Sequence, residues 1–173
     1  FPLKYLDRFK KDHLFYMAED YELCTYEKHH KQKILLFLSS MRSYADKLKN
    51  SNCKIEYYKI EDKNFKNTYF DKLKNIINKK KIKEVSSFEV EDKFFEKKLK
   101  IFFTKSKINW NVIRSPMFLN SRDEFKSYLS KSKKPFMATF YKEVRKKSGI
   151  LIGADGTPIG GKRSVDDENR NRL

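Results

Sequence analysis

The sequence has few cysteines and no long apolar segment. Its two cysteines, Cys24 and Cys53, form no CxxC pair and give no sign of a disulfide framework. No apolar run approaches the roughly 20 residues that a membrane span requires, and no signal-peptide pattern is present. We therefore expect a soluble protein of the reducing cytoplasm.

Glycine is equally scarce before the carboxyl-terminal part of the chain. All five glycines lie between Gly149 and Gly161, in the turn-rich run GILIGADGTPIGG, which we interpret as a linker or hairpin. Neither GxGxxG nor GxxxxGK[ST] occurs in the sequence. Because these patterns are the usual phosphate-binding loops, a nucleotide hydrolase is disfavoured.

Acidic residues are outnumbered by basic ones. Forty Lys and Arg face 23 Asp and Glu, which gives a net charge of +17. Such a charge favours phosphate-rich partners such as nucleic acid. Lysine is also spread along every segment together with Asn, Ile and Phe, a pattern that compositional drift produces equally well. The charge alone leaves both explanations open.

Short apolar runs alternate with longer segments of helical period, and this alternation is typical of βαβ units. Strands are expected at residues 14–18, 54–60, 84–90 and 110–113, and helices at 28–48, 65–80 and 94–103. Ser121 precedes Glu124 at capping-box spacing, which predicts a further helix there. The predicted fold class is α/β, with a doubly wound, mostly parallel, Rossmann-like sheet.

The stretch YEKHHKQKILLFLSSM places two histidines and several lysines directly before an apolar run. His29 and His30 are adjacent, so on a helix their side chains point about 100° apart and do not readily share a metal. We expect no metal site. One interpretation is a polar first turn followed by a core stripe at Ile34, Phe37, Leu38 and Met41. Alternatively, because a helix start disfavours cations, the basic turn faces a ligand.

Two other features have plain structural explanations. Glu89 and Glu91 would share one face of a strand, as an acid–base pair would need, but a solvated face is the simpler account. Trp110, the single tryptophan, is expected to pack in the core.

Four blocks, in order, carry a resemblance to a known family: TYEKHHKQKILLFLSSMRSYADKLK, FLNSRDEF, FMATFYKEVRKKSGIL and PIGGKRSVDDENR. Together they resemble the deoxyribodipyrimidine photolyase-related family, the prokaryotic iron–sulfur (6-4) photolyases and cryptochromes. The resemblance covers nearly the whole chain. It implies a photolyase-like α/β antenna domain at residues 1–148, with the first strand missing upstream, and a connector at 149–173.

The resemblance also implies cofactors and partners. FAD and a four-iron cluster would belong to a helical domain beyond Leu173, and two cysteines are too few to hold that cluster. No catalytic residue is expected in this segment. A ribityl-lumazine antenna would bind the α/β domain, at a wall formed by Glu19, Glu22, Tyr26, His29, Phe37 and Met41. The partner would be UV-damaged DNA, without a membrane, and the protein would be a monomer.

The resemblance implies an enzyme, a DNA photolyase (carbon–carbon lyase) that repairs UV-damaged DNA in a light-dependent reaction, most simply of the (6-4) photoproduct type. Two alternatives remain open. One is a blue-light cryptochrome photoreceptor with the same domains, and the other is a basic α/β binding module without catalysis. No residue of this segment separates repair from signalling.

Overall fold

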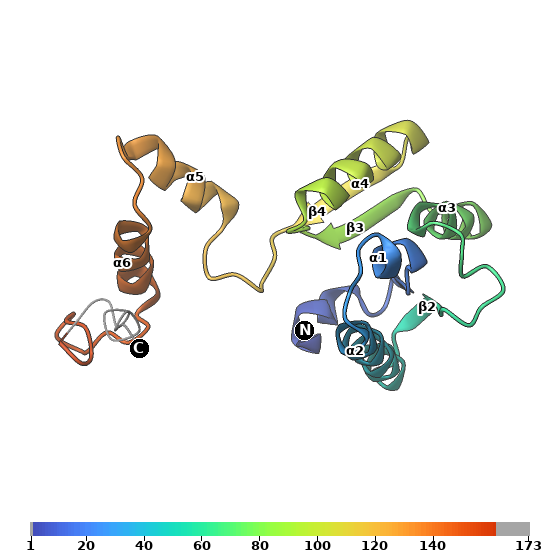
Figure 1. Cartoon of the computed structure of the whole chain (residues 1–173), viewed down its shortest axis with the longest axis horizontal. Helices are drawn as coiled ribbons and strands as arrows, with labels where there is room; N and C mark the ends of the chain where they lie inside the picture. Colours follow the sequence, from blue (N-terminus) through green and yellow to red (C-terminus); the bar gives the residue numbers. More distant parts are fainter. Residues whose placement is uncertain (1, 162–173) are drawn as a thin grey trace. The chain divides into compact units, whose positions relative to one another are not determined.

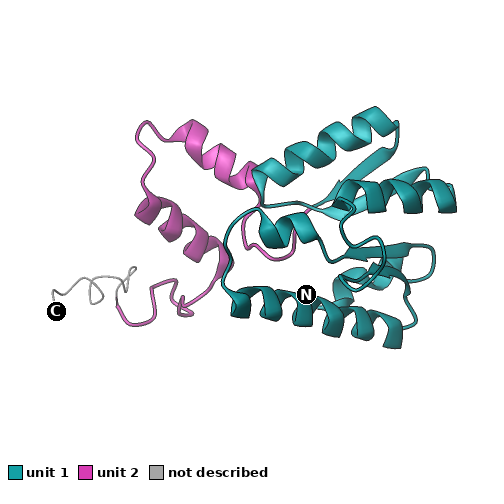
Figure 2. Cartoon of the chain, turned by 45° about the vertical axis from the view of Figure 1, so that its right-hand side comes forward, with its two compact units in different colours: residues 1–113 teal, residues 114–173 magenta. Residues whose placement is uncertain are grey.

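The computed structural model describes residues 2–161, and these fall into two compact units, residues 2–113 and 114–161 (Figure 2). The PIGGKRSVDDENR block lies mostly outside the described residues. The boundary expected at residue 148 stays a prediction.

The first unit alternates helices and short strands (Figure 1). In chain order it contains a 3-10 helix η1 (Leu3–Phe9), β1 (Leu14–Ala18), α1 (Tyr21–Thr25), α2 (Lys31–Asn50), β2 (Lys54–Tyr58), α3 (Tyr69–Lys80), β3 (Glu84–Phe88), α4 (Lys93–Ser106) and β4 (Asn109–Ile113). The expected strand at 14–18 is confirmed with the same bounds.

The four strands make two parallel pairs. In one, β1 pairs with β2 in the register Leu14 to Lys54, and in the other, β3 pairs with β4 in the register Glu84 to Asn109. No sheet in the described residues contains more than two strands. The prediction of an α/β, Rossmann-like domain with parallel strands is confirmed, although its strands form two small sheets.

Helices cover both faces of the strands. On one face, Leu14, Tyr16 and Trp110 pack against a core cluster from α3 and α4, with members Leu73, Ile76, Ile77, Leu99 and Phe103. On the other face, Phe15 and Met17 pack with Leu6 of η1 and Leu48 of α2. Figures 1 and 2 both show α2 and α4 on opposite sides of this unit. Alternate residues of β1 therefore serve two separate cores.

The helix expected at residues 65–80 begins later, at Tyr69. Thr68 forms a capping box with Asp71: its hydroxyl accepts from the Asp71 N–H, and the Asp71 carboxylate accepts from the Thr68 N–H. Phe65, the first residue of the predicted segment, lies in the loop that precedes the helix. A good capping residue four positions into the predicted segment decides where the helix starts.

The helix expected at 28–48 also begins later and runs from Lys31 to Asn50. Its N-cap is His30, whose Nδ1 accepts a hydrogen bond of 3.2 Å from the Gln32 N–H. At the start of the basic first turn, the imidazole of His30 thus accepts a hydrogen bond from a helix N–H that would otherwise have no partner within the helix. Neither η1 nor α1 was predicted, because their segments contain no periodic apolar pattern longer than one or two turns.

The second unit contains α5 (Arg122–Lys131) and α6 (Met137–Ser148). The predicted capping box is confirmed, since Ser121 and Glu124 exchange side chain to backbone hydrogen bonds of 3.1 and 2.7 Å. The Tyr128 hydroxyl bonds both the N–H and the carbonyl of Phe136, which fixes the start of α6 against α5. Helix α6 itself was not predicted, because its segment was considered only as the family block FMATFYKEVRKKSGIL.

The glycine-rich run that follows α6 folds back on itself. An isolated antiparallel bridge joins Ile152 to Pro158, as the hairpin interpretation predicts. The buried Arg145 donates to the carbonyl oxygens of Ile150 and Leu151 at 3.3 and 2.7 Å. Gly149 ends α6 with φ +67°, a left-handed conformation that favours glycine.

Candidate functional site at the carboxyl ends of β1 and β2

A buried carboxylate occupies the position directly after β1. The side chain of Glu19 is fully shielded from solvent, and its two oxygens accept four hydrogen bonds. Arg42 of α2 donates through Nε and Nη2 at 2.7 and 2.9 Å, and the Tyr57 hydroxyl of β2 donates at 2.6 Å. The N–H of Ile60 supplies the fourth bond, at 2.7 Å. Glu19 therefore ties β1, β2 and α2 together at one end of the sheet.

The surroundings of Glu19 strongly favour its ionised form. Burial opposes ionisation, but the hydrogen bonds from Arg42, Tyr57 and Ile60 outweigh it and lower the pKa of Glu19 to about 2. Burial and the bond to Glu19 raise the pKa of Tyr57 well above its ordinary value. Because Arg42 also contacts Glu61 at 2.7 Å, one guanidinium serves two carboxylates.

A buried ammonium group lies on the other side of the same strand end. Lys72 of α3 is buried, and its Nζ donates to the carbonyl oxygens of Glu19 and Phe65 at 3.1 and 3.0 Å. Asp20, also buried, caps α1 by accepting from the Glu22 N–H at 2.8 Å. The backbone at residues 19–20 is therefore held from both faces of the sheet.

Three of the residues predicted to bind a ligand lie in α1 and the loop that follows it. Tyr26 is 62% exposed, and its ring meets the His29 ring edge to face, with centroids 5.2 Å apart. His29 Nδ1 lies 3.5 Å from the Nζ of Lys33. Glu22 contacts Lys98 of α4 at 3.5 Å, and both side chains are exposed. The loop therefore presents an aromatic pair with polar groups beside it, accessible from solvent.

Phe37 and Met41 lie on α2, one turn apart. The prediction that Phe37 belongs to an inward core stripe is wrong, because the ring is 59% exposed. Ile34, Leu38 and Met41 of that stripe are half-buried. The physical reason is length: α2 has 20 residues, about 30 Å, whereas the strands have five, about 17 Å. The helix overhangs the sheet, and its buried residues, Ala45 and Leu48, lie in its second half.

The structure brings together only part of the predicted wall. Glu19 is connected to α2 through Arg42, which is adjacent to Met41, and Tyr26 contacts His29. Sequence reasoning missed Arg42, Tyr57 and Lys72. No local signal could have paired Glu19 with Arg42, because they are 23 positions apart and Arg42 resembles any other basic residue of the helix.

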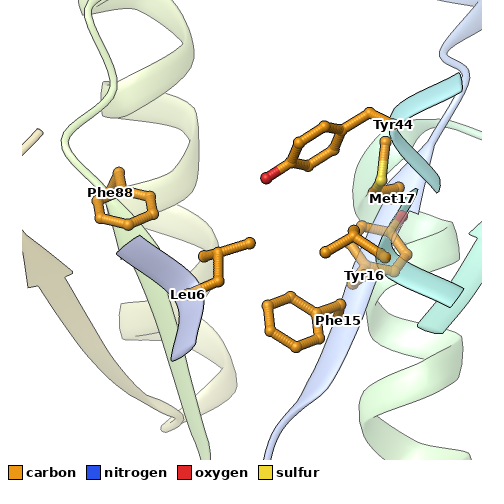
Figure 3. Close-up of a pocket in the computed structure, with 7 residues that line it drawn as sticks. Leu6, Phe15, Tyr16, Met17, Tyr44 and Phe88 are labelled. Carbon is orange, nitrogen blue, oxygen red and sulfur yellow. The ribbon is translucent and has the colours of Figure 1, made fainter. Parts of the chain in front are cut away.

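A cavity of about 220 Å³ lies elsewhere in this unit, between β1 and β3 (Figure 3). Its lining is mostly apolar and consists of Leu6, Phe15, Tyr16, Met17, Tyr44, Leu48 and Phe88. Within the part of the chain that the structure describes, no group of three or more His, Cys, Asp and Glu side chains is arranged to hold a metal ion. No helix among these residues is long and apolar enough to cross a membrane.

Comparison with known proteins identifies the family. The model of the family described as "Deoxyribodipyrimidine photo-lyase-related protein" matches residues 3–173. The chain belongs to this photolyase-related family. It is also 27% identical, over 161 residues, to a protein of Agrobacterium fabrum (strain C58 / ATCC 33970) named (6-4) photolyase. The match covers 93% of this chain and 32% of the relative, so this photolyase-related chain spans about one third of the relative's length.

Proposed function

We propose that this chain is the amino-terminal α/β domain of a light-dependent enzyme that repairs UV-damaged DNA of the (6-4) photoproduct type. In this proposal FAD and a four-iron cluster are held outside residues 1–173, in the remainder of the natural protein. The domain would then supply positioning and light collection for chemistry that belongs to the flavin.

One observation carries the proposal: the similarity to the (6-4) photolyase extends over 93% of this chain. A match of that extent involves the whole domain and not one motif. The net charge of +17 is the kind of field that attracts the phosphates of duplex DNA.

We further propose that the exposed surface around Tyr26, His29 and Phe37 binds a ribityl-lumazine antenna. A flat heteroaromatic ring needs aromatic or apolar contacts and a few polar groups at its edges. Tyr26 and Phe37 supply exposed rings, His29 and Glu22 supply polar edges, and Met41 supplies an apolar contact. Both Glu19 oxygens are already bonded, so Glu19 would act by positioning α2 through Arg42.

The experiment that tests the main proposal is a spectrum followed by a repair assay. The natural protein, purified in the dark, should absorb as a flavoprotein with a broad iron–sulfur shoulder. Illuminated with blue light, it should convert an oligonucleotide that carries one defined (6-4) photoproduct, whereas the dark sample should not. A flavin-loaded protein without light-dependent conversion would contradict repair and favour the photoreceptor. A protein that neither contains nor accepts FAD would favour the basic binding module.

The antenna proposal makes a separate prediction. Tyr26→Ala should lower the lumazine content of the natural protein about fivefold to tenfold, because a stacked aromatic contact contributes roughly 1 kcal/mol or more. Absorbance and fluorescence of the extracted chromophore measure that content. Tyr141→Ala, at an exposed tyrosine of α6, is the matched control and should leave it unchanged. Equal lumazine content in the two variants would overturn the assignment, and the flavin content reports whether each variant is folded.

A further inference from the structure

The turns that lead into β3 and β4 have the same structure. Helix α3 is followed by Lys81 and helix α4 by Lys107, and both lysines adopt a left-handed backbone with φ 53°. The next residue of each turn, Ile82 or Ile108, donates its N–H to a helix carbonyl five positions back, at 2.9 and 3.3 Å. Both isoleucines pack against the core cluster of α3 and α4. Each turn is therefore anchored to the core, and the lysine that precedes the isoleucine is exposed.

The two turns lie side by side. Strands β3 and β4 pair from their first residues, Glu84 and Asn109, and the Asn109 N–H donates to the Lys83 carbonyl at 3.2 Å. Helix α4 connects the end of β3 to the start of β4, so its last turn lies at the end of the sheet where both strands begin (Figure 1). Neighbouring strands are about 5 Å apart. The amino ends of β3 and β4 therefore carry one shared surface.

Lysines are concentrated on this surface, and we call them the lysine patch: Lys79, Lys80, Lys81, Lys83, Lys105 and Lys107. All of them are exposed, and none forms a salt bridge within the described residues. The only carboxylate in residues 79–84 and 104–109 is that of Glu84, which accepts a hydrogen bond from Asn111 at 3.4 Å. The positive charges of the patch therefore have almost no local compensation.

The charge of this strand pair differs between its two ends. The loop from β3 to α4, residues 89–92, reads EVED and contains no basic residue. An even spread of lysine along the chain therefore does not explain the patch. Helix dipoles favour cations in the last turn, which accounts for three of the lysines. Lys83 lies outside both helices, and Lys81 and Lys107 occupy left-handed positions that glycine fits best, so the dipole alone does not explain the patch either.

The composition of the patch indicates which polyanion fits it. Residues 79–84 and 104–109 contain lysine, which binds phosphate as a point charge, and no arginine that could form a bidentate pair with a base edge or a carboxylate. Neither segment contains an aromatic side chain on which an unpaired base could stack. Their large apolar residues, Ile82 and Ile108, are half-buried against the core and are not available for insertion into a lipid surface. The phosphates of a nucleic-acid duplex match these features best.

We propose that the lysine patch binds the phosphate backbone of duplex DNA, independently of base sequence and of damage. This contact rests on the proposed function, in which DNA is the partner of the natural protein, and it is made by the α/β unit itself. Lysines on two adjacent turns reach several phosphates at once, because a duplex carries one negative charge per about 1.7 Å of its axis. Contacts of this kind hold undamaged duplex weakly and allow a protein to slide along it.

Fluorescence anisotropy of the natural protein with an undamaged duplex tests the proposal. A triple variant combines Lys81→Gln, Lys83→Gln and Lys107→Gln. Its affinity at about 100 mM salt should be at least about tenfold lower than that of the unsubstituted protein. The slope of log affinity against log salt should also become smaller by about 2 to 3, because each phosphate contact contributes roughly 0.9.

The matched control removes the same number of positive charges from the loop that follows β2. Lys59→Gln, Lys63→Gln and Lys66→Gln all replace exposed lysines. Because the net charge is the same in the two variants, the control should lose less than about threefold in affinity, from the weaker long-range field alone. Equal losses in the two variants, or no loss in the patch variant, would overturn the proposal.

Lysine footprinting of the unsubstituted natural protein keeps the test decisive if a variant does not fold. Acetylation by an N-hydroxysuccinimide ester, measured by mass spectrometry, should slow at the patch lysines by at least about fivefold when the duplex is added in excess. It should not slow at Lys59, Lys63 and Lys66. Unchanged acetylation of the patch would refute the proposal. Protection of the patch by phosphatidylserine vesicles and not by the duplex would assign it to a lipid surface instead.

Light-dependent repair by the same samples separates this inference from the proposed function. If the natural protein converts the (6-4) photoproduct and the patch variant binds undamaged duplex as tightly as the control, the patch assignment fails and the repair proposal stands. If the patch variant loses duplex affinity as expected but the flavin-loaded natural protein converts no photoproduct, repair is contradicted and the patch assignment stands.

Discussion

At the scale of single residues, the buried carboxylate of Glu19 is central to the arrangement of the described structure. A carboxylate that is fully buried is costly unless its hydrogen bonds are satisfied. Here four donors from α2, β2 and the loop that follows β2 satisfy it, and the bidentate bond to Arg42 adds directionality. We infer that Glu19 contributes to the arrangement of the strand ends and that its removal disturbs β1, β2 and α2 together.

This environment predicts a specific acid dependence of stability. The pKa of Glu19 lies near 2 in the folded protein against an ordinary value of 4.5. Because the folded value is the lower one, the stabilisation is fully present above about pH 4.5 and is lost as the pH falls toward 2. The difference between these two pKa values corresponds to roughly 3 kcal/mol in the free energy of unfolding. Glu19→Gln should therefore destabilise the natural protein by about that amount at pH 7, and the deficit should shrink below pH 4.5.

Denaturant unfolding at several pH values measures this effect. The control is Glu22→Gln, because Glu22 forms only an exposed contact with Lys98 and should change the free energy of unfolding by less than about 1 kcal/mol. If the deficit of Glu19→Gln stays constant between pH 7 and pH 2.5, the loss comes from packing and not from charge.

At the scale of elements, helix α3 depends on its capping box. The Thr68 hydroxyl and the Asp71 carboxylate satisfy donors that the first turn would otherwise leave free. This helix carries Leu73, Ile76 and Ile77 of the core cluster and Lys72 of the strand-end network. Loss of these capping hydrogen bonds should therefore lower the stability of the whole α/β unit.

Replacement of the capping residue should have a measurable cost. Thr68→Ala should lower the free energy of unfolding by about 1 kcal/mol, the usual value of an N-cap. Thr104→Ala is the matched control, because Thr104 lies inside α4 and its hydroxyl bonds only the carbonyl of Lys100. It should be neutral or slightly stabilising, since alanine has the higher helix propensity. Equal losses in the two variants would show that the cap does not stabilise α3.

At the scale of the whole molecule, the net charge of +17 gives a prediction about DNA. If the natural protein binds duplex DNA through its phosphates, affinity should fall steeply with salt, by about a hundredfold or more between 50 and 200 mM. Fluorescence anisotropy with an undamaged duplex measures this loss. Far-UV circular dichroism at each salt concentration is the control for folding. An affinity that does not depend on salt would contradict an electrostatic role for the charge.

The local signals of the sequence predicted the local structure well. The strand at 14–18 and the capping box of Ser121 and Glu124 both appear as expected, because a short apolar run and N-cap chemistry are properties of a few neighbouring residues. The four family blocks likewise indicated the photolyase-related family, which the match over residues 3–173 establishes. These inferences needed no knowledge of contacts distant in the sequence.

Only the tertiary structure decided which distant residues meet. Glu19 is bonded by Arg42, Tyr57 and Ile60, which lie 23 to 41 positions away, and no local pattern encodes such pairs. The exposure of Phe37 follows from the mismatch between a long helix and short strands, which only the assembled layers show. The cavity between β1 and β3 also appears only in three dimensions. The local sequence determines the hydrophobic periodicity and the capping residues of each element. The order and separation of the strands depend instead on how the elements pack.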